Sequence, residues 1–399
     1  MKKLMILGGT RFVLPAIEAA HQLGAHVITC DYLPGNYAHR FSDQYCNVST
    51  IDCEAVLKAA MELQIDGILS YASDAGAVTA AYVAREMNLP GNPYESVTIL
   101  QNKGRFRSYL KEHGYHVPCA KTYDSPREAV LERGMWEYPV IVKPTDSAGS
   151  KGVTRVDSPD GMEKAALLAA DTSIEGHLIV EQFIPQAGYS TDSDSFSIGS
   201  ELVFCSFNDQ MFDTRARNPY APAGFLWPSS MRHAAQAELR GEIARLIREL
   251  EIGTAIYNIE TRLGMDGKTY IMELSPRAGG NRLAEMLRYA TGQDIILSTV
   301  QYALGFAIDP VPVQPVYHGF WGEAILHSRQ EGIYDGISIE SDARRCAVEV
   351  DMHVEKGDPV HSFSSGRDEI GTLVLHSSSR EELEGILRNI DEMVQIKVR

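Results

Sequence analysis

Residues 257–281 read YNIETRLGMDGKTYIMELSPRAGGN, and this stretch decides how the centre of the chain folds. Asp266-Gly267 stands between two runs of alternating residues, a pattern that predicts a β-hairpin with a type I′ turn. With these two residues at the centre of the turn, Glu260 lies directly opposite Glu273 on one face of the hairpin. The other face is expected to pack on a core through Ile259, Thr261, Leu263, Tyr270, Met272 and Leu274.

The two opposed glutamates indicate a metal site. Carboxylates in this position have Cβ atoms about 4.5 to 5.5 Å apart and repel each other. A divalent cation would remove the repulsion, and Mg²⁺ fits because it prefers oxygen ligands and completes its shell with water and phosphate. The alternative is a polar face whose glutamates point into water. The residues that follow favour the metal, because Arg277 offers a fork for phosphate or carboxylate and a Gly-rich segment comes next.

Two lysines and a loop upstream of the hairpin indicate phosphate binding. Lys143 ends the apolar strand PVIV, and the loop 145–152 offers small residues and backbone N–H groups that can enclose phosphates. The spacing is not that of a Walker loop. Taken alone, Lys143 and Lys103 also fit ordinary solvated lysines. Residues 181–185 follow the apolar strand LIV and fit either a connector that pairs with a purine edge or a plain strand end.

Length, charge and cysteine content exclude several classes of protein. The 399 residues exceed one ordinary domain and predict two or three. A formal net charge of −16 argues against partners that need clustered Lys and Arg, such as nucleic acid or an anionic membrane. Six cysteines without a CxxC pair favour reduced thiols in the cytoplasm. Because no apolar run approaches about 18 residues, we expect no membrane span.

The order of elements predicts an α/β and α+β multidomain protein. Residues 1–94 alternate short apolar strands with helices, which is typical of a doubly wound parallel sheet. Its first turn, Gly8-Gly9-Thr10, lacks GxGxxG, which disfavours an oxidoreductase that binds a dinucleotide there. Residues 95–306 contain mixed, largely antiparallel strands, and residues 307–399 are rich in strands. The polar, Pro-rich stretch 218–229 is expected to be a mobile loop.

The order of these motifs resembles the ATP-grasp superfamily over roughly residues 95–305. Lys103 comes first, followed by VIVKP with the loop SAGSKGV, then VEQFI, and then the hairpin NIETRL…IMELSPRAGG. The N-terminal segments LGGTRFVLPAI and SYASDAGAVTAAYVA look like the domain that precedes the grasp module in ligases such as biotin carboxylase, carbamoyl phosphate synthetase and dipeptide ligases. The resemblance implies an ATP-grasp module of two α+β subdomains.

The resemblance also implies roles for individual residues. Those implied to hold ATP are Lys103 and Lys143 at the phosphates, Ser147, Gly149 and Ser150 in the flap, Glu181 and Ile184 at adenine, and Gln182 and Phe183 lining the pocket. Glu260 and Glu273 match ligands of Mg²⁺, with Mn²⁺ as an alternative, and Arg277 acts with Lys143 in catalysis. Two positions depart from the family. Ser275 stands where the family has an Asn metal ligand and is the third candidate ligand here, with water or Asn258 as the alternative because a hydroxyl is a poorer ligand than an amide oxygen. Gly188 replaces a ribose-binding Glu, for which Asp192 or Asp194 would substitute.

The implied activity is that of an ATP-dependent ligase that phosphorylates a carboxylate and couples it to an amine. Its partners would be small-molecule carboxylates and amines, and the chain would form a homodimer. Arg215 and Arg217 are candidates to clamp a substrate carboxylate, with Trp227 and Phe225 as an apolar wall. A purine-biosynthetic or bicarbonate-activating enzyme and a non-catalytic nucleotide sensor stay open as alternatives.

Overall fold

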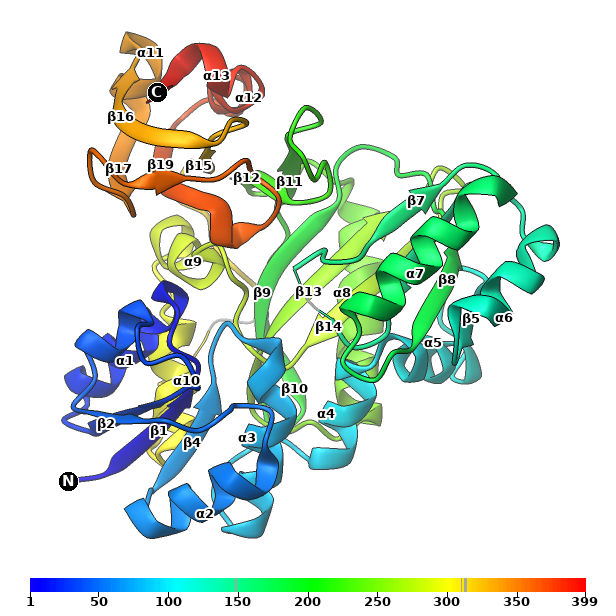
Figure 1. The fold of residues 1–399 in the computed structure, drawn as a ribbon. Coiled ribbons are helices and arrows are strands. Elements are labelled where there is room, and N and C mark those ends of the chain that lie inside the picture. The colour runs from blue at the N-terminus through cyan, green and yellow to red at the C-terminus, as the bar shows by residue number, and fades with distance from the viewer. Residues whose placement is uncertain (148, 310, 312–313) are drawn as a thin grey trace.

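The computed structural model describes residues 1–147, 149–309, 311 and 314–399 (Figure 1). Its N-terminal part is a parallel sheet of order β3-β2-β1-β4, which confirms the expected doubly wound arrangement. Helices α1 and α10 cover one face, and α2 and α3 cover the other, so β1 and β2 are nearly continuous apolar runs. The strands are β1 Lys3–Leu7, β2 His26–Cys30, β3 Gln44–Cys46 and β4 Gly67–Ser70, and the helices are α1 Leu14–Gln22, α2 Cys53–Leu63, α3 Asp74–Glu86 and α10 Ile295–Ala303.

Two antiparallel sheets follow, as expected for the middle of the chain. The first has the order β5-β8-β6-β7 and packs against α6 and α7. The second has the order β10-β9-β13-β14 and packs against α5 and α8. Their elements are α4 Tyr94–Gln101, α5 Lys103–Glu112, β5 Ala120–Tyr123, α6 Pro126–Leu131, β6 Val140–Pro144, β7 Thr154–Val156, α7 Met162–Thr172, β8 Leu178–Gln182, β9 Thr191–Ile198, β10 Glu201–Cys205, α8 His233–Glu249, β13 Ala255–Leu263 and β14 Thr269–Ser275.

The C-terminal part contains a sheet of order β11-β12-β15-β19-β17 and a small sheet of order β18-β16-β20. Its first two strands come from the middle of the chain, before residue 306. The remaining elements are β11 Asp209–Phe212, β12 Pro222–Trp227, α9 Leu283–Thr291, β15 Phe320–His327, β16 Gly332–Ile339, α11 Ser341–Cys346, β17 Ala347–Met352, β18 Pro359–Val360, β19 Glu369–Ser377, α12 Arg380–Arg388, α13 Ile390–Met393 and β20 Val394–Val398; short 3₁₀ turns lie at Arg11–Val13, Tyr37–Arg40, Arg133–Met135, Pro159–Gly161 and Gly366–Asp368.

The expectation of a mobile loop at residues 218–229 is wrong, because β12 lies inside the C-terminal sheet. Pro222 is tolerated as the first residue of a strand, where it gives up no interior ladder bond. Gly224 is required by a close approach, since a Cβ atom there would lie 2.8 Å from the carbonyl oxygen of Glu323. Pro222 therefore stands at the start of a strand and Gly224 at a close contact with the neighbouring strand, and neither indicates a loop.

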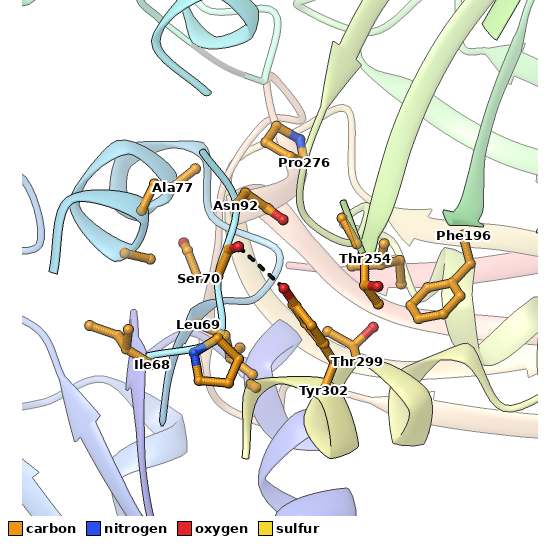
Figure 2. A pocket seen from close by; sticks show the side chains of 17 residues that line it. Ile68, Leu69, Ser70, Ala77, Asn92, Phe196, Thr254, Pro276, Thr299 and Tyr302 are labelled. Atoms are coloured by element: carbon orange, nitrogen blue, oxygen red, sulfur yellow. Dashed lines mark hydrogen bonds between the residues drawn. The ribbon is translucent and has the colours of Figure 1, made fainter. Parts of the chain in front are cut away.

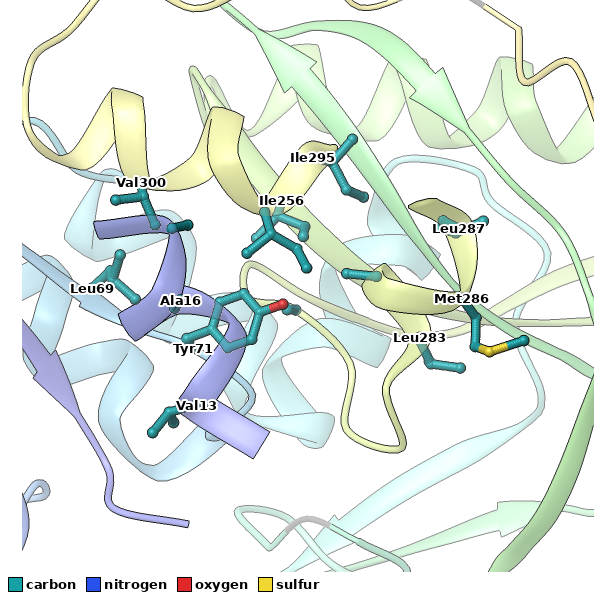
Figure 3. Close-up of a cluster of buried hydrophobic side chains, with 14 of the residues drawn as sticks. Val13, Ala16, Leu69, Tyr71, Ile256, Leu283, Met286, Leu287, Ile295 and Val300 are labelled. Carbon is teal, nitrogen blue, oxygen red and sulfur yellow. The ribbon is translucent and has the colours of Figure 1, made fainter. Parts of the chain in front are cut away.

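One hydrophobic core joins the N-terminal sheet to the rest of the chain. Figure 3 shows Tyr71 beneath α9 and α10, with Ile256 of β13 and Val300 of α10 beside it. All three side chains are buried. Among the residues that the structure describes, no helix has both the length and the apolar character needed to cross a membrane.

Candidate functional site

The hairpin places its two glutamates as the sequence predicts. Glu260 pairs with Glu273, and Asn258 pairs with Ser275, in β13 and β14. The expected type I′ turn is wrong, because only Gly267 of the two central residues has a positive φ, at 81°. The Gly267 N–H donates instead to the carbonyl of Gly264 at 2.9 Å, which gives a longer turn closed by one left-handed glycine.

A β-bulge at Met272 explains how the longer turn still gives the expected pairing. Next to the turn, Leu263 pairs with Thr269, one residue out of the predicted register. The register then shifts between Ile271 and Glu273, so that Met272 is the extra residue of β14. The shift also corrects the predicted core face, because Ile271 is buried at 4% exposure while Met272 is only half-buried.

Glu260 and Glu273 form a carboxylate pair that a ligand can reach. Their side chains are 35% and 31% exposed. Nζ of Lys103 lies 3.7 Å from Oε2 of Glu273, and Nη2 of Arg262 lies 3.7 Å from Oε1 of Glu260. Desolvation by burial raises the pKa of Glu260, and the charge of Glu273 adds to the rise. Two accessible, mutually repelling carboxylates are a donor set that fits Mg²⁺ shared with phosphate oxygens.

Strand β9 adds two aspartates, for which the family resemblance implies only a role at the ribose. Asp192 lies opposite Glu260, and Asp194 lies opposite Asn258, so both share the face of the metal pair. Nδ2 of Asn258 donates to Asp192 at 2.6 Å and to Asp194 at 3.3 Å. Burial raises the pKa of Asp192 to about 8 and that of Asp194 to about 7. Two acidic residues at a spacing of two within a strand were the signal that would have placed them here.

Asp194 also fixes the glycine-rich segment after the hairpin. The Gly279 N–H donates to both carboxylate oxygens of Asp194, at 2.9 and 3.1 Å. A Cβ atom on Gly279 would lie 2.5 Å from Leu283, 2.8 Å from Asn258 and 2.9 Å from Asp194. Only glycine fits this position, and the close packing holds the segment that carries Arg277.

Arg277 is engaged by a residue of the N-terminal part. Its Nε and Nη2 donate to the two carboxylate oxygens of Asp74 at 2.8 and 2.5 Å, and Nη1 donates to the Ala278 carbonyl at 2.8 Å. Asp74 is the first residue of α3. Ser275, expected to help bind metal, is buried at 1% exposure and hydrogen-bonds to Asp74. One proton each on Nη1 and Nη2 is left for another acceptor.

The two predicted phosphate lysines come from different elements. Lys103 begins α5, where the Asn102 side chain caps the helix, and its Nζ donates to the Ser147 carbonyl at 2.7 Å. Nζ of Lys143 lies 2.8 Å from Oε2 of Glu181, and Lys143 is 9% exposed. Desolvation lowers the pKa of Lys143, although Glu181 opposes the shift. Each ammonium group therefore lies beside a carboxylate, and a bound phosphate would be a second anionic partner for it.

The predicted flap lies between the lysines and the C-terminal part. Gly149 and Ser150 have φ values of 68° and 57°, and the Ser150 hydroxyl donates to the Tyr220 carbonyl at 3.2 Å. Ala148, in the same loop, lies outside the described residues. Gly152 has a φ of 70° and packs so closely that a Cβ atom would lie 2.8 Å from the Thr172 hydroxyl. The flap is thus held at both ends by backbone and small side chains.

The predicted adenine hinge runs from Glu181 to Ile184. The Gln182 N–H donates to the Cys119 carbonyl at 2.8 Å, and the Phe183 N–H donates to the Pro139 carbonyl at 3.1 Å. Among the described residues, the Ile184 N–H has no hydrogen-bond partner, so it is available to a ring nitrogen. Burial opposes the ionisation of Glu181, but nearby cations outweigh burial and lower its pKa to about 2.

The predicted substrate residues are not brought together. Arg215 pairs with Asp391 of α13, and Arg217 is exposed. Trp227 is fully buried at 0% exposure, and it packs on Phe225 with ring centroids 5.8 Å apart. The aromatic pair therefore belongs to the core under the C-terminal sheet rather than to an open wall.

A cavity of about 60 Å³ lies elsewhere, between α3, β13 and α10 (Figure 2). Its lining is mostly apolar, and the Tyr302 hydroxyl donates across it to the Gly91 carbonyl at 3.3 Å. A nucleotide needs a pocket several times larger, of roughly 300 Å³ or more. The cavity lacks the lysines and the opposed glutamates, so it does not match the predicted nucleotide site.

Comparison with known proteins agrees with this geometry. Residues 100–281 match the family described as "ATP-grasp domain". The carbamoyl phosphate synthase large chain of Thermotoga neapolitana is 27% identical over 208 residues, covering 51% of this chain and 19% of that protein. The formate-dependent phosphoribosylglycinamide formyltransferase of Bacteroides thetaiotaomicron is 26% identical over 285 residues, covering 69% and 71%. The solved L-amino acid ligase of Bacillus licheniformis has a TM-score of 0.81 at 20% identity, covering 100% and 99%.

These likenesses differ in what they establish. The chain spans about a fifth of the length of the carbamoyl phosphate synthase chain it matches, since 19% of that protein is covered. The likeness to the solved ligase, at 20% identity, shows the fold. The family match covers the lysines, the hinge, the opposed glutamates and Arg277. The comparison therefore assigns residues 100–281 to an ATP-grasp domain.

Proposed function

We propose that this enzyme is an ADP-forming ligase that converts a carboxylate to an acyl phosphate and joins it to an amine. The observation that carries the proposal is the pair Glu260 and Glu273, opposed across a hairpin inside an ATP-grasp domain. Nζ of Lys103 lies 3.7 Å from Oε2 of Glu273. Arg277 comes two residues after Ser275, at the end of the same hairpin. Such a set of cations around a metal pair suits phosphoryl transfer to an anion.

In the first step, a carboxylate oxygen attacks the γ-phosphorus of ATP, the bond to the bridging oxygen breaks, and ADP leaves. Two anions meet in this step, and Lys103, Lys143 and the free protons of Arg277 would offset their repulsion. Mg²⁺ bound by Glu260 and Glu273 would supply further positive charge and align the phosphates. The hinge at residues 181–184 would hold the base, with the Ile184 N–H donating to it.

In the second step, an amine attacks the acyl carbon, phosphate leaves, and the amine gives up a proton. The flap at residues 145–152 would cover the site during this step, because water competes with the amine for the acyl phosphate. Asp194 and Asp74 would keep Arg277 near the leaving phosphate through the contacts described above. The products are ADP, phosphate and an amide.

The carboxylate and the amine are the open part of the proposal. The likeness to a formate-dependent phosphoribosylglycinamide formyltransferase over 71% of its length favours, as a second candidate, an enzyme that activates a small carboxylate in purine biosynthesis. We therefore include formate and bicarbonate beside amino acids among the carboxylates to be screened.

The test measures ADP and phosphate release by the full chain with ATP, Mg²⁺ and pairs drawn from panels of carboxylates and amines. We expect one pair to raise ADP release well above the rate with ATP alone, and to yield the amide by mass spectrometry. ADP release that no carboxylate stimulates, in protein that binds MgADP, would contradict a ligase and favour a nucleotide sensor. Light scattering on the same protein checks the expected homodimer.

A further inference from the structure

Arg107 is a buried cation on α5 that touches two separate parts of the proposed nucleotide site. Its side chain is 4% exposed. Nε lies 2.9 Å from Oε1 of Glu181 in the hinge, and Nη2 donates to the Met272 carbonyl at 2.7 Å. Lys103 lies four residues earlier on the same helix face. One helix thus supplies a cation to the phosphate region and a cation to the hinge.

The contact with Met272 has a specific structural reason. Met272 is the extra residue of the bulge, immediately before Glu273. Within the part of the chain that the structure describes, strand β14 forms the edge of its sheet, so no further strand there supplies a donor to this carbonyl. A backbone carbonyl left without a donor is costly, and Arg107 removes that cost. By stabilising the bulge, Arg107 supports the register in which Glu273 faces Glu260.

Arg262 makes a second connection of the same kind from β13. Its side chain is 17% exposed, Nη1 donates to the Ile184 carbonyl at 3.2 Å, and Nη2 lies 3.7 Å from Oε1 of Glu260. Each arginine therefore joins one end of the hinge to the strand that carries one of the opposed glutamates. Neither occupies a position to which the family resemblance assigns a role.

We propose that Arg107 and Arg262 are positioning residues that hold the adenine hinge at a fixed distance from the two metal-binding carboxylates. The inference rests on the proposed function, because it takes residues 181–184 as the base site and the glutamate pair as the Mg²⁺ site. With both arginines in place, a nucleotide whose base binds the hinge presents its phosphates to a preformed metal site. Nucleotide and Mg²⁺ then strengthen each other's binding through the two contacts.

The test measures ADP binding to the full chain by isothermal titration calorimetry, once with saturating Mg²⁺ and once with EDTA. The ratio of the two dissociation constants reports the coupling between nucleotide and metal. Arg107→Lys and Arg262→Lys keep the charge but lose the two-point geometry of the guanidinium. We expect each to reduce the ratio by about fivefold or more relative to wild type. Arg105→Lys, at an exposed position of the same helix, should keep the wild-type ratio.

The outcomes separate this inference from the proposed function. If wild type binds MgADP and both variants keep its ratio, the positioning role is overturned, and a lower Tm with an unchanged ratio overturns it equally. If wild type binds no ADP under either condition, the nucleotide site itself is wrong. Circular dichroism checks each fold, and should Arg107→Lys fail to fold, Arg262→Lys, on the more accessible side chain, decides the question.

Discussion

Arg277 and Asp74 form a two-point ion pair, with N···O distances of 2.8 and 2.5 Å, between residues 203 positions apart in the chain. Their side chains are 9% and 16% exposed. Burial opposes the ionisation of Asp74, but Arg277 outweighs burial and lowers the pKa of Asp74. The arginine expected to steady the transferred phosphate is therefore fixed by the first helix residue after the N-terminal sheet's last strand.

Asp74→Asn should impair both stability and turnover. The substitution leaves a buried guanidinium without its counter-charge, which typically costs about 3 to 5 kcal/mol. Because Arg277 would then lose its two-point contact with the N-terminal part, we expect kcat to fall about tenfold or more with a smaller change in KM for ATP. Urea unfolding and steady-state kinetics measure the two effects. Glu86→Gln, in an exposed pair on the same helix, should change stability by less than about 1 kcal/mol. An unchanged kcat in Asp74→Asn would exclude the positioning of Arg277.

Glu273→Gln should abolish Mg²⁺-dependent ADP formation while the fold stays intact. The amide keeps the shape of the side chain but removes the charge that the cation needs, so we expect a loss of about 100-fold or more in kcat. Coupled detection of ADP at increasing Mg²⁺ gives the measurement. Glu201→Gln, on an exposed side chain of β10, is the control that should behave as wild type. Wild-type turnover in Glu273→Gln would refute the metal assignment.

Gly279→Ala should be far more harmful than Gly280→Ala. A methyl group at Gly279 would lie 2.5 to 2.9 Å from Leu283, Asn258 and Asp194, whereas nothing lies within 4 Å of one at Gly280. Forcing the extra atom into this contact should cost about 1 to 3 kcal/mol and displace the segment of Arg277. Thermal unfolding and kcat measured side by side test the contrast. Equal behaviour of the two alanine variants would argue against the tight contact with Asp194.

The stability of the nucleotide-free protein should depend on pH through Glu181. Its pKa of about 2 lies below the ordinary value of 4.5 because Arg107 and Lys143 outweigh burial. A depressed folded-state pKa stabilises the protein above pH 4.5, and the effect is lost as the pH falls from 4.5 toward 2. The loss is on the order of 3 kcal/mol. Urea unfolding of wild type and Glu181→Gln should therefore show a stability gap that shrinks with falling pH. A gap independent of pH would contradict the assignment.

Local patterns predicted the central hairpin better than they predicted its turn. The pairing of Glu260 with Glu273 holds because the bulge at Met272 compensates for the longer turn. A bulge has no simple signature in one sequence, so the half-buried Met272 and the buried Ile271 could not be foreseen from alternation alone. Likewise, the prolines and glycine near β12 suggested a loop, since the partner strand β15 comes about a hundred residues later.

Contacts between distant segments account for what the sequence left out. Asp74, Arg107 and Asp192 stand in helices or strands of ordinary appearance, and only the packing of separate layers brings them to the hairpin. The residues of the family pattern were visible because they follow apolar strands or sit in Gly-rich loops. The charged residues that hold them in place could not be identified from the sequence, because the order of the strands in the sheets and the packing of the layers determine which residues they contact.

Helix α10 joins α1 in covering one face of the sheet of β1 to β4, and β11 with β12 completes a sheet of the C-terminal part. Segments distant in the sequence therefore pack together at two places, and cleaving the chain at one position would not give two fragments that each keep a complete sheet and core. A fragment that ends near residue 94 would lack α10, expose the apolar face that α10 covers, and aggregate. The intact protein should accordingly melt in one cooperative transition, and limited proteolysis should leave either the whole chain or small peptides.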